Sequence, residues 1–154
     1  MMNPIRSKCA FTLVEIMIVV AIIGLLAALG LPGMLEAGRK SRKARFAREI
    51  QNAGHAFAQF AFINGRYPPD KTPAQMPNGM AEYLKDFPWT EKTVIGGYWD
   101  WDYEVFGIVA GVSVDSPSWD SEQMQKIDAM IDDGNLGTGE FRQRFGGYIY
   151  ILEE

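Results

Sequence analysis

Residues 11–31 read FTLVEIMIVVAIIGLLAALGL, and only Thr12 and Glu15 in this stretch carry polar side chains. As an α-helix the stretch extends about 31 Å, which is close to the hydrocarbon thickness of a bilayer. A proline and a glycine follow at positions 32 and 33, and a basic run begins at Arg39. The sequence therefore predicts an N-terminal helix that enters a membrane.

Two ordinary interpretations of residues 11–31 compete. A secretory signal peptide would use Arg6 and Lys8 as its basic region, but the apolar stretch exceeds the usual length of about 7–15 residues. A lipoprotein signal fits less well, because Cys9 precedes the apolar stretch. A plain single-span anchor satisfies every length criterion. It leaves Glu15 unexplained, because a carboxylate among apolar side chains costs roughly 2.5–3.5 kcal/mol on insertion scales.

A third interpretation rests on residues 8–20, which read KCAFTLVEIMIVV. They resemble the cleavage and methylation signature of type IV prepilins and type II secretion pseudopilins. The resemblance implies that a membrane peptidase removes a basic leader between Ala10 and Phe11 and that Phe11 is then N-methylated. It also implies a glutamate at the fifth mature position and often a proline at the twenty-second, which are Glu15 and Pro32 here. The family usually has glycine before the cut, whereas this chain has Ala10.

The resemblance implies an assembly role for Glu15 and Pro32. A carboxylate inside an apolar stack needs a charged partner. The free or methylated amine of a neighbouring chain, offset along a helical stack, would supply that partner. A filament therefore explains the acid that a plain anchor does not.

The topology rules disagree on this chain. Six Lys or Arg residues lie within residues 39–48, against Arg6, Lys8 and the start amine before the apolar stretch. The positive-inside rule would place the C-terminal part in the cytoplasm. The resemblance implies a cytoplasmic leader and a periplasmic or extracellular head on a single-pass inner-membrane protein, and we follow it because its motif is specific.

Residues 34–63 continue a helical pattern with one apolar stripe at intervals of three and four residues. Asn64 and Gly65 predict its end, and Pro68 follows. We expect one helix from about residue 11 to 63, loosened around Pro32, whose second half packs on a sheet. The stripe consists of Phe46, Ile50, Ala53, Phe57 and Phe60.

The remainder predicts an α+β head. A short helix is expected at 80–87, strands at 98–106 and 108–114 as a hairpin or one bent strand, a helix at 119–132, and a closing strand at 148–152. Together these patterns predict a pilin-like fold, a long N-terminal helix on a small antiparallel sheet. The expected divisions are a leader at 1–10, a transmembrane and assembly helix at 11–32, its amphipathic continuation at 33–64, and a globular head at 65–154.

Composition limits the chemistry. The chain has 154 residues with one cysteine and one histidine, Cys9 and His55. It therefore forms no internal disulfide, and most His/Cys metal sites and any Cys-His or Ser-His-Asp arrangement that requires a second cysteine or histidine are excluded. Residues 1–48 carry eight basic and two acidic side chains, a net charge of +6. Residues 49–154 carry seven basic and seventeen acidic ones, a net charge of −10. This unequal distribution of charge bears on which partners the chain attracts and on self-association, and not on the fold.

Three clusters could carry a further function. The first is Asp132, Asp133 and Asn135, with Glu140, which could supply oxygen ligands to calcium. Some major pseudopilins bind calcium in a late loop, although this composition is also ordinary for a helix end and turn. We therefore expect no cofactor, with calcium as the alternative.

The second cluster is Asp100, Asp102 and Glu104, which share one face of a strand. A glycosidase-like carboxylate pair is conceivable, but we expect a solvated face opposite Trp99 and Trp101. The third is the basic run at 39–45, which next to a membrane meets lipid head groups or an acidic neighbour more naturally than nucleic acid.

The sequence thus predicts a non-enzymatic structural subunit of a pilus-like filament, in first place a type II secretion pseudopilin. One alternative is a type IV pilin of a surface or DNA-uptake fibre, and another is a non-assembling binding protein on a single-span anchor. The expected partners are copies of itself, other pilin-like subunits, the prepilin peptidase and methylase, an inner-membrane assembly platform and membrane lipid. Nucleic acid is not an expected partner.

Overall fold

The computed structural model of the protein describes the backbone of residues 11–154 and the side chains of all of these except residues 29–32. The predicted leader at 1–10 lies outside the described residues. The chain divides into two units, of which the first ends at Arg39 and the second comprises Lys40–Glu154.

One helix, α1 (Leu13–Asn64), begins in the first unit and ends in the second. It is the one helix in the described chain that is long and apolar enough to cross a membrane. The helix continues through residues 30–33, so the loosening expected around Pro32 is absent from the described backbone. Its end at Asn64 matches the prediction, and the following Gly65 adopts φ of 69°, the left-handed conformation that ends many helices.

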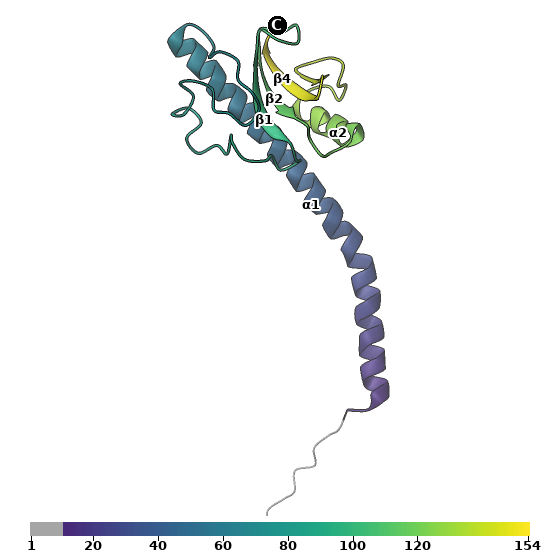
Figure 1. Ribbon diagram of the computed structural model, residues 1–154. Helices are drawn as coiled ribbons and strands as arrows, with labels where there is room; N and C mark the ends of the chain where they lie inside the picture. The colour runs from purple at the N-terminus through teal and green to yellow at the C-terminus, as the bar shows by residue number, and fades with distance from the viewer. Residues whose placement is uncertain (1–10) are drawn as a thin grey trace, which may run out of the picture. The chain divides into compact units, whose positions relative to one another are not determined.

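The second unit contains a four-stranded antiparallel sheet in the order β1-β2-β4-β3 (Figure 1). Its strands are β1 (Tyr98–Tyr103), β2 (Ala110–Asp115), β3 (Phe141–Arg144) and β4 (Gly147–Glu153). β1 and β2 pair as a hairpin, which resolves the alternative of one bent strand. The C-terminal strand β4 lies between β2 and β3, so the last residues of the chain complete the middle of the sheet.

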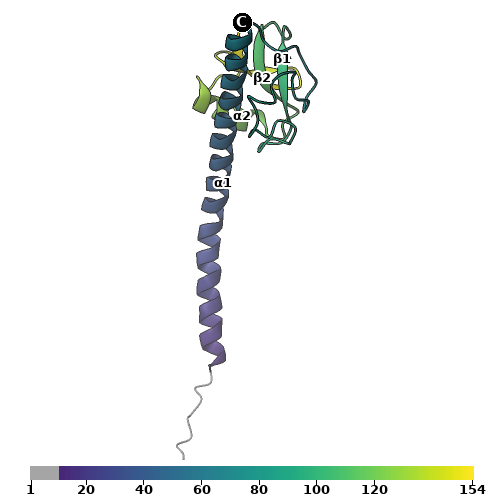
Figure 2. The same ribbon diagram turned by 90° about the vertical axis from the view of Figure 1, so that its left-hand side faces the viewer.

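The apolar stripe of α1 packs on one face of this sheet, and Figure 2 shows the helix running beside β1 and β2. Phe57 stacks on Trp101 with ring centroids 3.8 Å apart, and Phe46 stacks on Trp99 at 5.4 Å. Gly54 allows a close approach, because a Cβ there would lie 2.9 Å from Leu152. The predicted core stripe is confirmed, with Phe60 at its half-buried end.

Helix α2 (Ser121–Ile131) contributes to the same core. Asp120 caps it, since its side chain accepts a hydrogen bond from the Gln123 N–H at 2.9 Å. Met124 and Ile127 are fully buried on its inner face. The predicted helix at 119–132 is therefore confirmed within two residues at each end.

One prediction about the head is wrong, and one strand was not predicted. Residues 80–87 form consecutive turns rather than an α-helix, because the segment buries only Met80 and Leu84 and has too few residues to form a stable helix. Strand β3 was not predicted at all. Its residues are Phe-Arg-Gln-Arg, which lacks the β-branched composition of a recognisable strand.

Candidate assembly site

The first unit exposes almost every apolar side chain it has. Phe11 is 79% exposed and Leu25 64%, although such residues are normally buried. The described chain gives them no cover, and an apolar surface of this length marks a membrane or protein contact. The exposed side chains in this stretch are Phe11, Leu13, Val14, Ile16, Met17, Ile18, Val19, Val20, Ile22, Ile23, Leu25 and Leu26.

Glu15 has a partner within its own chain. Its Oε2 atom accepts hydrogen bonds from the Thr12 backbone N–H and from the Thr12 hydroxyl, both at 2.8 Å. The Thr12 Oγ1 atom accepts one from the Glu15 N–H at 3.2 Å. This is a capping box, in which side chains satisfy two N–H groups at the start of α1. The Glu15 carboxylate therefore already has hydrogen-bond donors within its own chain. The sequence alone had indicated that its partner must come from a neighbouring chain.

The basic segment, residues 39–48, lies along α1 just after the apolar stretch. Most of its Lys and Arg side chains are exposed, with Lys43 half-buried. Within the described residues one of them forms an ion pair: Arg45 Nε lies 2.7 Å from Glu49 Oε1, with the Arg45 side chain 62% exposed. The other cations of this segment remain available to an anionic surface.

The face of the sheet opposite α1 contains a buried ion cluster. The guanidinium of Arg144 on β3 lies 2.8 Å from Asp100 Oδ2 and 3.0 Å from Asp102 Oδ2, both on β1. It also donates a hydrogen bond to Ser113 Oγ at 2.8 Å. The ring of Phe106 covers the guanidinium at 4.9 Å. The expectation of a solvated carboxylate face is therefore wrong for Asp100 and Asp102, whereas Glu104 is exposed.

This cluster holds more negative than positive charge. Burial raises the pKa of Asp100 to about 7, with the neighbouring Asp102 carboxylate as the second cause and the Arg144 guanidinium opposing both. Burial likewise raises the pKa of Asp102, and the Ser113 hydroxyl and Arg144 oppose that shift. The arrangement is an ion pair that links the two edge strands of the sheet, since Arg144 reaches across β4 and β2.

A second acidic cluster lies at the C-terminal end of α2. Oxygens of Asp128, Asp132 and Asp133 lie within 4.8 Å of one another. Of the calcium candidates named from the sequence, Asp132 and Asp133 belong to this cluster. Asn135 does not belong to it, and the third member is Asp128. The Asn135 Oδ1 atom instead accepts a hydrogen bond from the Gly137 N–H at 3.2 Å. Three convergent carboxylates fit a hard divalent cation.

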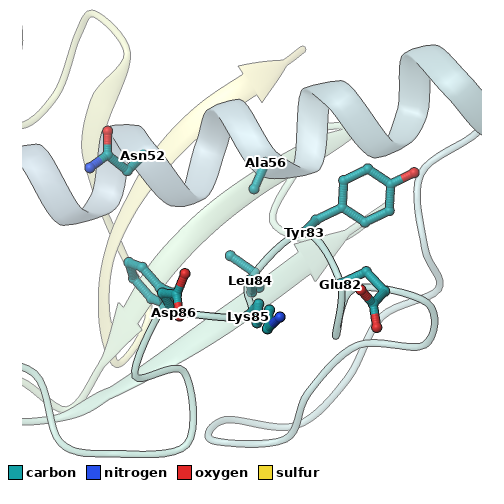
Figure 3. Close-up of a pocket in the computed structure, with 8 residues that line it drawn as sticks. Asn52, Ala56, Glu82, Tyr83, Leu84, Lys85 and Asp86 are labelled. Atoms are coloured by element: carbon teal, nitrogen blue, oxygen red, sulfur yellow. The ribbon is translucent and has the colours of Figure 1, made fainter.

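A groove of about 380 Å³ lies between α1 and residues 82–87 (Figure 3). Asn52 and Ala56 line it from the helix, and Glu82 and Asp86 line it from the turn segment. Its charged side chains, Glu82, Lys85 and Asp86, are all exposed.

Sequence reasoning missed Arg144 and Asp128 as partners in these clusters. Arg144 belongs to the unpredicted strand β3, and it meets β1 only through a sheet whose order places the C-terminal strand in the middle. Asp128 was not identified because it lies inside a helix and not in the loop where ligands were sought. Its spacing four residues before Asp132, which places both at one helix face, was the signal that could have found it.

A long N-terminal helix followed by a small four-stranded antiparallel sheet is an α+β, pilin-like architecture. Residues 5–31 match the family model of the prokaryotic N-terminal methylation motif. The chain therefore carries a prepilin-type N-terminal motif, as the pattern around Phe11 and Glu15 predicted.

Known proteins resemble this chain over part of its length. It is 43% identical over 63 residues to the type IV major alpha-pilin of Moraxella bovis and, over the same number of residues, to fimbrial protein Q of that organism. These matches cover 41% of this chain and 39% and 40% of the two relatives. The chain thus spans well under half the length of the curated relatives it matches. No solved structure matches it.

Proposed function

We propose that this protein is a structural subunit of a pilus-like filament, of the type II secretion pseudopilin kind, with no chemistry of its own. The observation that carries the proposal is the uncovered apolar helix of the first unit, which begins with a methylation motif and a charged residue at its start. In a membrane, lipid covers this helix. In a filament, neighbouring helices replace the lipid and pack by van der Waals contact.

Assembly would proceed from a membrane-anchored precursor. The prepilin peptidase removes residues 1–10, the methylase modifies Phe11, and an inner-membrane platform adds the subunit to a growing stack. In this division residues 11–32 form the membrane and assembly helix, 33–64 its continuation, and 65–154 the head, which lies in the periplasm or outside the cell. The partners are further copies, other pilin-like subunits and membrane lipid.

Glu15 has two roles in this scheme. Before assembly its carboxylate accepts hydrogen bonds from Thr12, which holds the charge at the helix start. During assembly it exchanges those donors for the methylated amine of an adjacent subunit, which is a stronger partner because it carries a full charge. The pair then fixes the axial offset between neighbouring chains.

The test compares Glu15→Val with Glu36→Val, an acid on the same helix beyond the apolar stretch. Both variants should enter the membrane, because neither adds a charge. N-terminal mass spectrometry should find both beginning at a methylated Phe11. Only Glu15→Val should reduce the amount of filaments recovered by shearing. It alone should also abolish crosslinks between the assembly helices, residues 11–32, of neighbouring copies.

Three results would contradict the proposal. The first is a mature chain that still begins at Met1 or that begins after Leu31. The second is normal filament yield from Glu15→Val. The third is equal loss of filaments in both variants, which would indicate a general effect of removing an acid from the helix.

A second candidate is a type IV pilin of a surface fibre, because the two relatives named above are a type IV pilin and a fimbrial protein. The single cysteine favours the pseudopilin, since it leaves the head without a disulfide pair. Deletion of the gene separates the two. Loss of an exported protein without loss of surface fibres indicates the pseudopilin, and loss of the fibres indicates the pilin.

A further inference from the structure

The chain contains two Asn-Gly dipeptides, Asn64-Gly65 and Asn78-Gly79, and the fold places them in different surroundings. Asparagine is among the thermally labile residues. Its side-chain carbonyl carbon can be attacked by the backbone nitrogen of the next residue, and a glycine there hinders the attack least because it has no side chain. The reaction therefore depends on whether that nitrogen and the asparagine amide are free to approach each other.

The first dipeptide, Asn64-Gly65, is held at the end of α1. The Gly65 N–H donates a hydrogen bond to the Ala61 carbonyl at 2.8 Å, so the attacking nitrogen is engaged. The Asn64 Nδ2 atom, which would leave as ammonia, donates to the Phe60 carbonyl at 2.9 Å. Both residues are exposed to water, yet they can react only after the helix end opens locally.

The second dipeptide, Asn78-Gly79, forms the centre of an exposed turn. The Met80 N–H closes the turn by donating to the Pro77 carbonyl at 3.1 Å. Gly79 adopts φ of 84°, the left-handed conformation that the third position of a type II turn requires. The backbone hydrogen bonds of the described loops include none from the Gly79 N–H. The attacking nitrogen is therefore not engaged in the backbone here, and both residues are open to water.

We propose that Asn78 deamidates spontaneously in the folded protein, whereas the helix end protects Asn64. The Gly79 nitrogen forms a bond to the Asn78 side-chain carbonyl carbon and gives up its proton, and the side-chain nitrogen leaves as ammonia. The product is a cyclic succinimide. Water then adds to one of the two ring carbonyls and opens the ring, which yields aspartate or isoaspartate. The step needs no oxidant or reductant, and its co-reactant is water.

This modification would alter both the charge and the backbone of the head. Either product adds a negative charge at position 78 to a head that is already net acidic. In isoaspartate the side-chain methylene becomes part of the backbone, so the turn lengthens. Little room exists for a longer turn, because Pro77 and Met80 are buried and a Cβ at Gly79 would lie 2.8 Å from Phe60. This inference concerns the head alone and holds whether or not the chain forms filaments.

The test incubates the full-length protein in detergent micelles at mildly alkaline pH and follows both dipeptides by mass spectrometry of their peptides. Replacement of the side-chain NH2 by OH appears as a mass increase, and the aspartate and isoaspartate peptides separate by chromatography. In the folded protein Asn78 should convert at least about tenfold faster than Asn64, because two hydrogen bonds must open before Asn64 can react. In denaturant both dipeptides are free, so the two rates should become similar.

The matched variants are Asn78→Gln and Asn64→Gln, each of which keeps the amide but lengthens the side chain and so disfavours ring closure. Asn78→Gln should abolish the acidic species that accumulates in the wild type on isoelectric focusing, and Asn64→Gln should leave it unchanged. The wild-type measurement is decisive by itself, since it does not require either variant to fold. The inference is overturned if Asn64 converts as fast as Asn78 in the folded protein, or if Asn78 stays intact there while both dipeptides react in denaturant.

Discussion

At the scale of single residues, Arg144 connects more of the head than any other charged side chain that the structure describes. It pairs with Asp100 and Asp102 on the far edge strand, and its side chain is only 5% exposed. Replacement of a buried ion pair by apolar residues is often neutral, but removal of one partner leaves the others charged and buried. The Arg144 cluster is therefore a feature in which a single substitution has a large effect.

We expect Arg144→Met to destabilise the head by about 3–5 kcal/mol, because it leaves two buried carboxylates without a cation. Arg142→Met is the matched control on the same strand. It removes a partly exposed pair with Glu154 and should cost no more than about 1 kcal/mol. Denaturant unfolding of the full chain in micelles, followed by tryptophan fluorescence, measures both. Equal losses in the two variants would show that the cluster does not stabilise the head.

The same cluster predicts a pH dependence. The pKa of Asp100 is raised to about 7 in the folded head, against an ordinary value of about 4 in the unfolded chain. Between these values the folded state binds the extra proton, so stability falls as the pH rises through this window. The change is at most about 1.4 kcal/mol per pH unit for this group.

The head should therefore unfold more easily at pH 8 than at pH 5 when a chelator is present. Asp100→Asn should flatten that slope in part. The residual slope comes from Asp102 and Asp128, whose pKa values are raised in the same direction. A wild-type head that is more stable at pH 8 than at pH 5 would contradict this assignment.

At the scale of elements, the second half of α1 joins the sheet through aromatic stacking. Phe57 contacts Trp101 and also Trp89, whose ring centroid lies 5.3 Å away. Five residues later on the same helix, Phe62 is 91% exposed. The two phenylalanines are chemically identical and differ only in burial, so they provide a matched pair.

Phe57→Ala should cost about 3–5 kcal/mol, since it removes a buried aromatic side chain and leaves a cavity. Phe62→Ala should change the free energy of unfolding by less than about 0.5 kcal/mol, because the side chain packs on nothing within the chain. Unfolding of both variants in micelles gives the comparison. Similar effects of the two changes would mean that the stripe does not form the core of the head.

The helices and most strands followed from local pattern. The stripe from Phe46 to Phe57 has helical spacing, and the Trp-Asp-Trp-Asp alternation around Trp99 has the period of a strand, so each could be predicted without knowledge of the rest of the fold. Local pattern failed where a distant contact decides the outcome. β3 is a strand because β4 pairs with it, and Asp100 is buried because Arg144 reaches it from 44 residues away in the sequence.

Some residues of the candidate site could likewise be identified from local sequence pattern, and others could not. The motif around Phe11 and Glu15 could be recognised because it is contiguous and has fixed spacing, and residues 5–31 match the family model. The roles assigned to Phe11, Glu15 and Pro32 stay predictions. The Thr12–Glu15 capping box was readable from the sequence, since a threonine three residues before a glutamate is its signature. The role of Asp128 was not readable, because it depends on which helical residues the fold buries.

At the scale of the whole molecule, charge is distributed unequally along the chain, with +6 on residues 1–48 and −10 on residues 49–154. In the proposed filament, like segments of stacked copies would repel, whereas the basic segment of one copy would attract the acidic head of the next. A single exposed pair contributes typically 0.2–1 kcal/mol and is screened by salt. Repeated over many subunits, the contacts can select one axial register, while the apolar helices supply the cohesion.

Reversal of this charge tests the register. Arg42, Lys43 and Arg45 changed together to Glu should reduce filament yield several-fold, and the defect should shrink as salt is raised. The control changes Arg66, Lys85 and Lys92, exposed bases of the head, to Glu, which alters the net charge by the same amount. Reversal of head acids such as Glu82 and Asp86 to Lys should partly restore assembly of the basic-segment variant. If no head reversal restores it while the anionic lipid content of the membrane controls the defect, the basic segment binds lipid head groups and does not set the register.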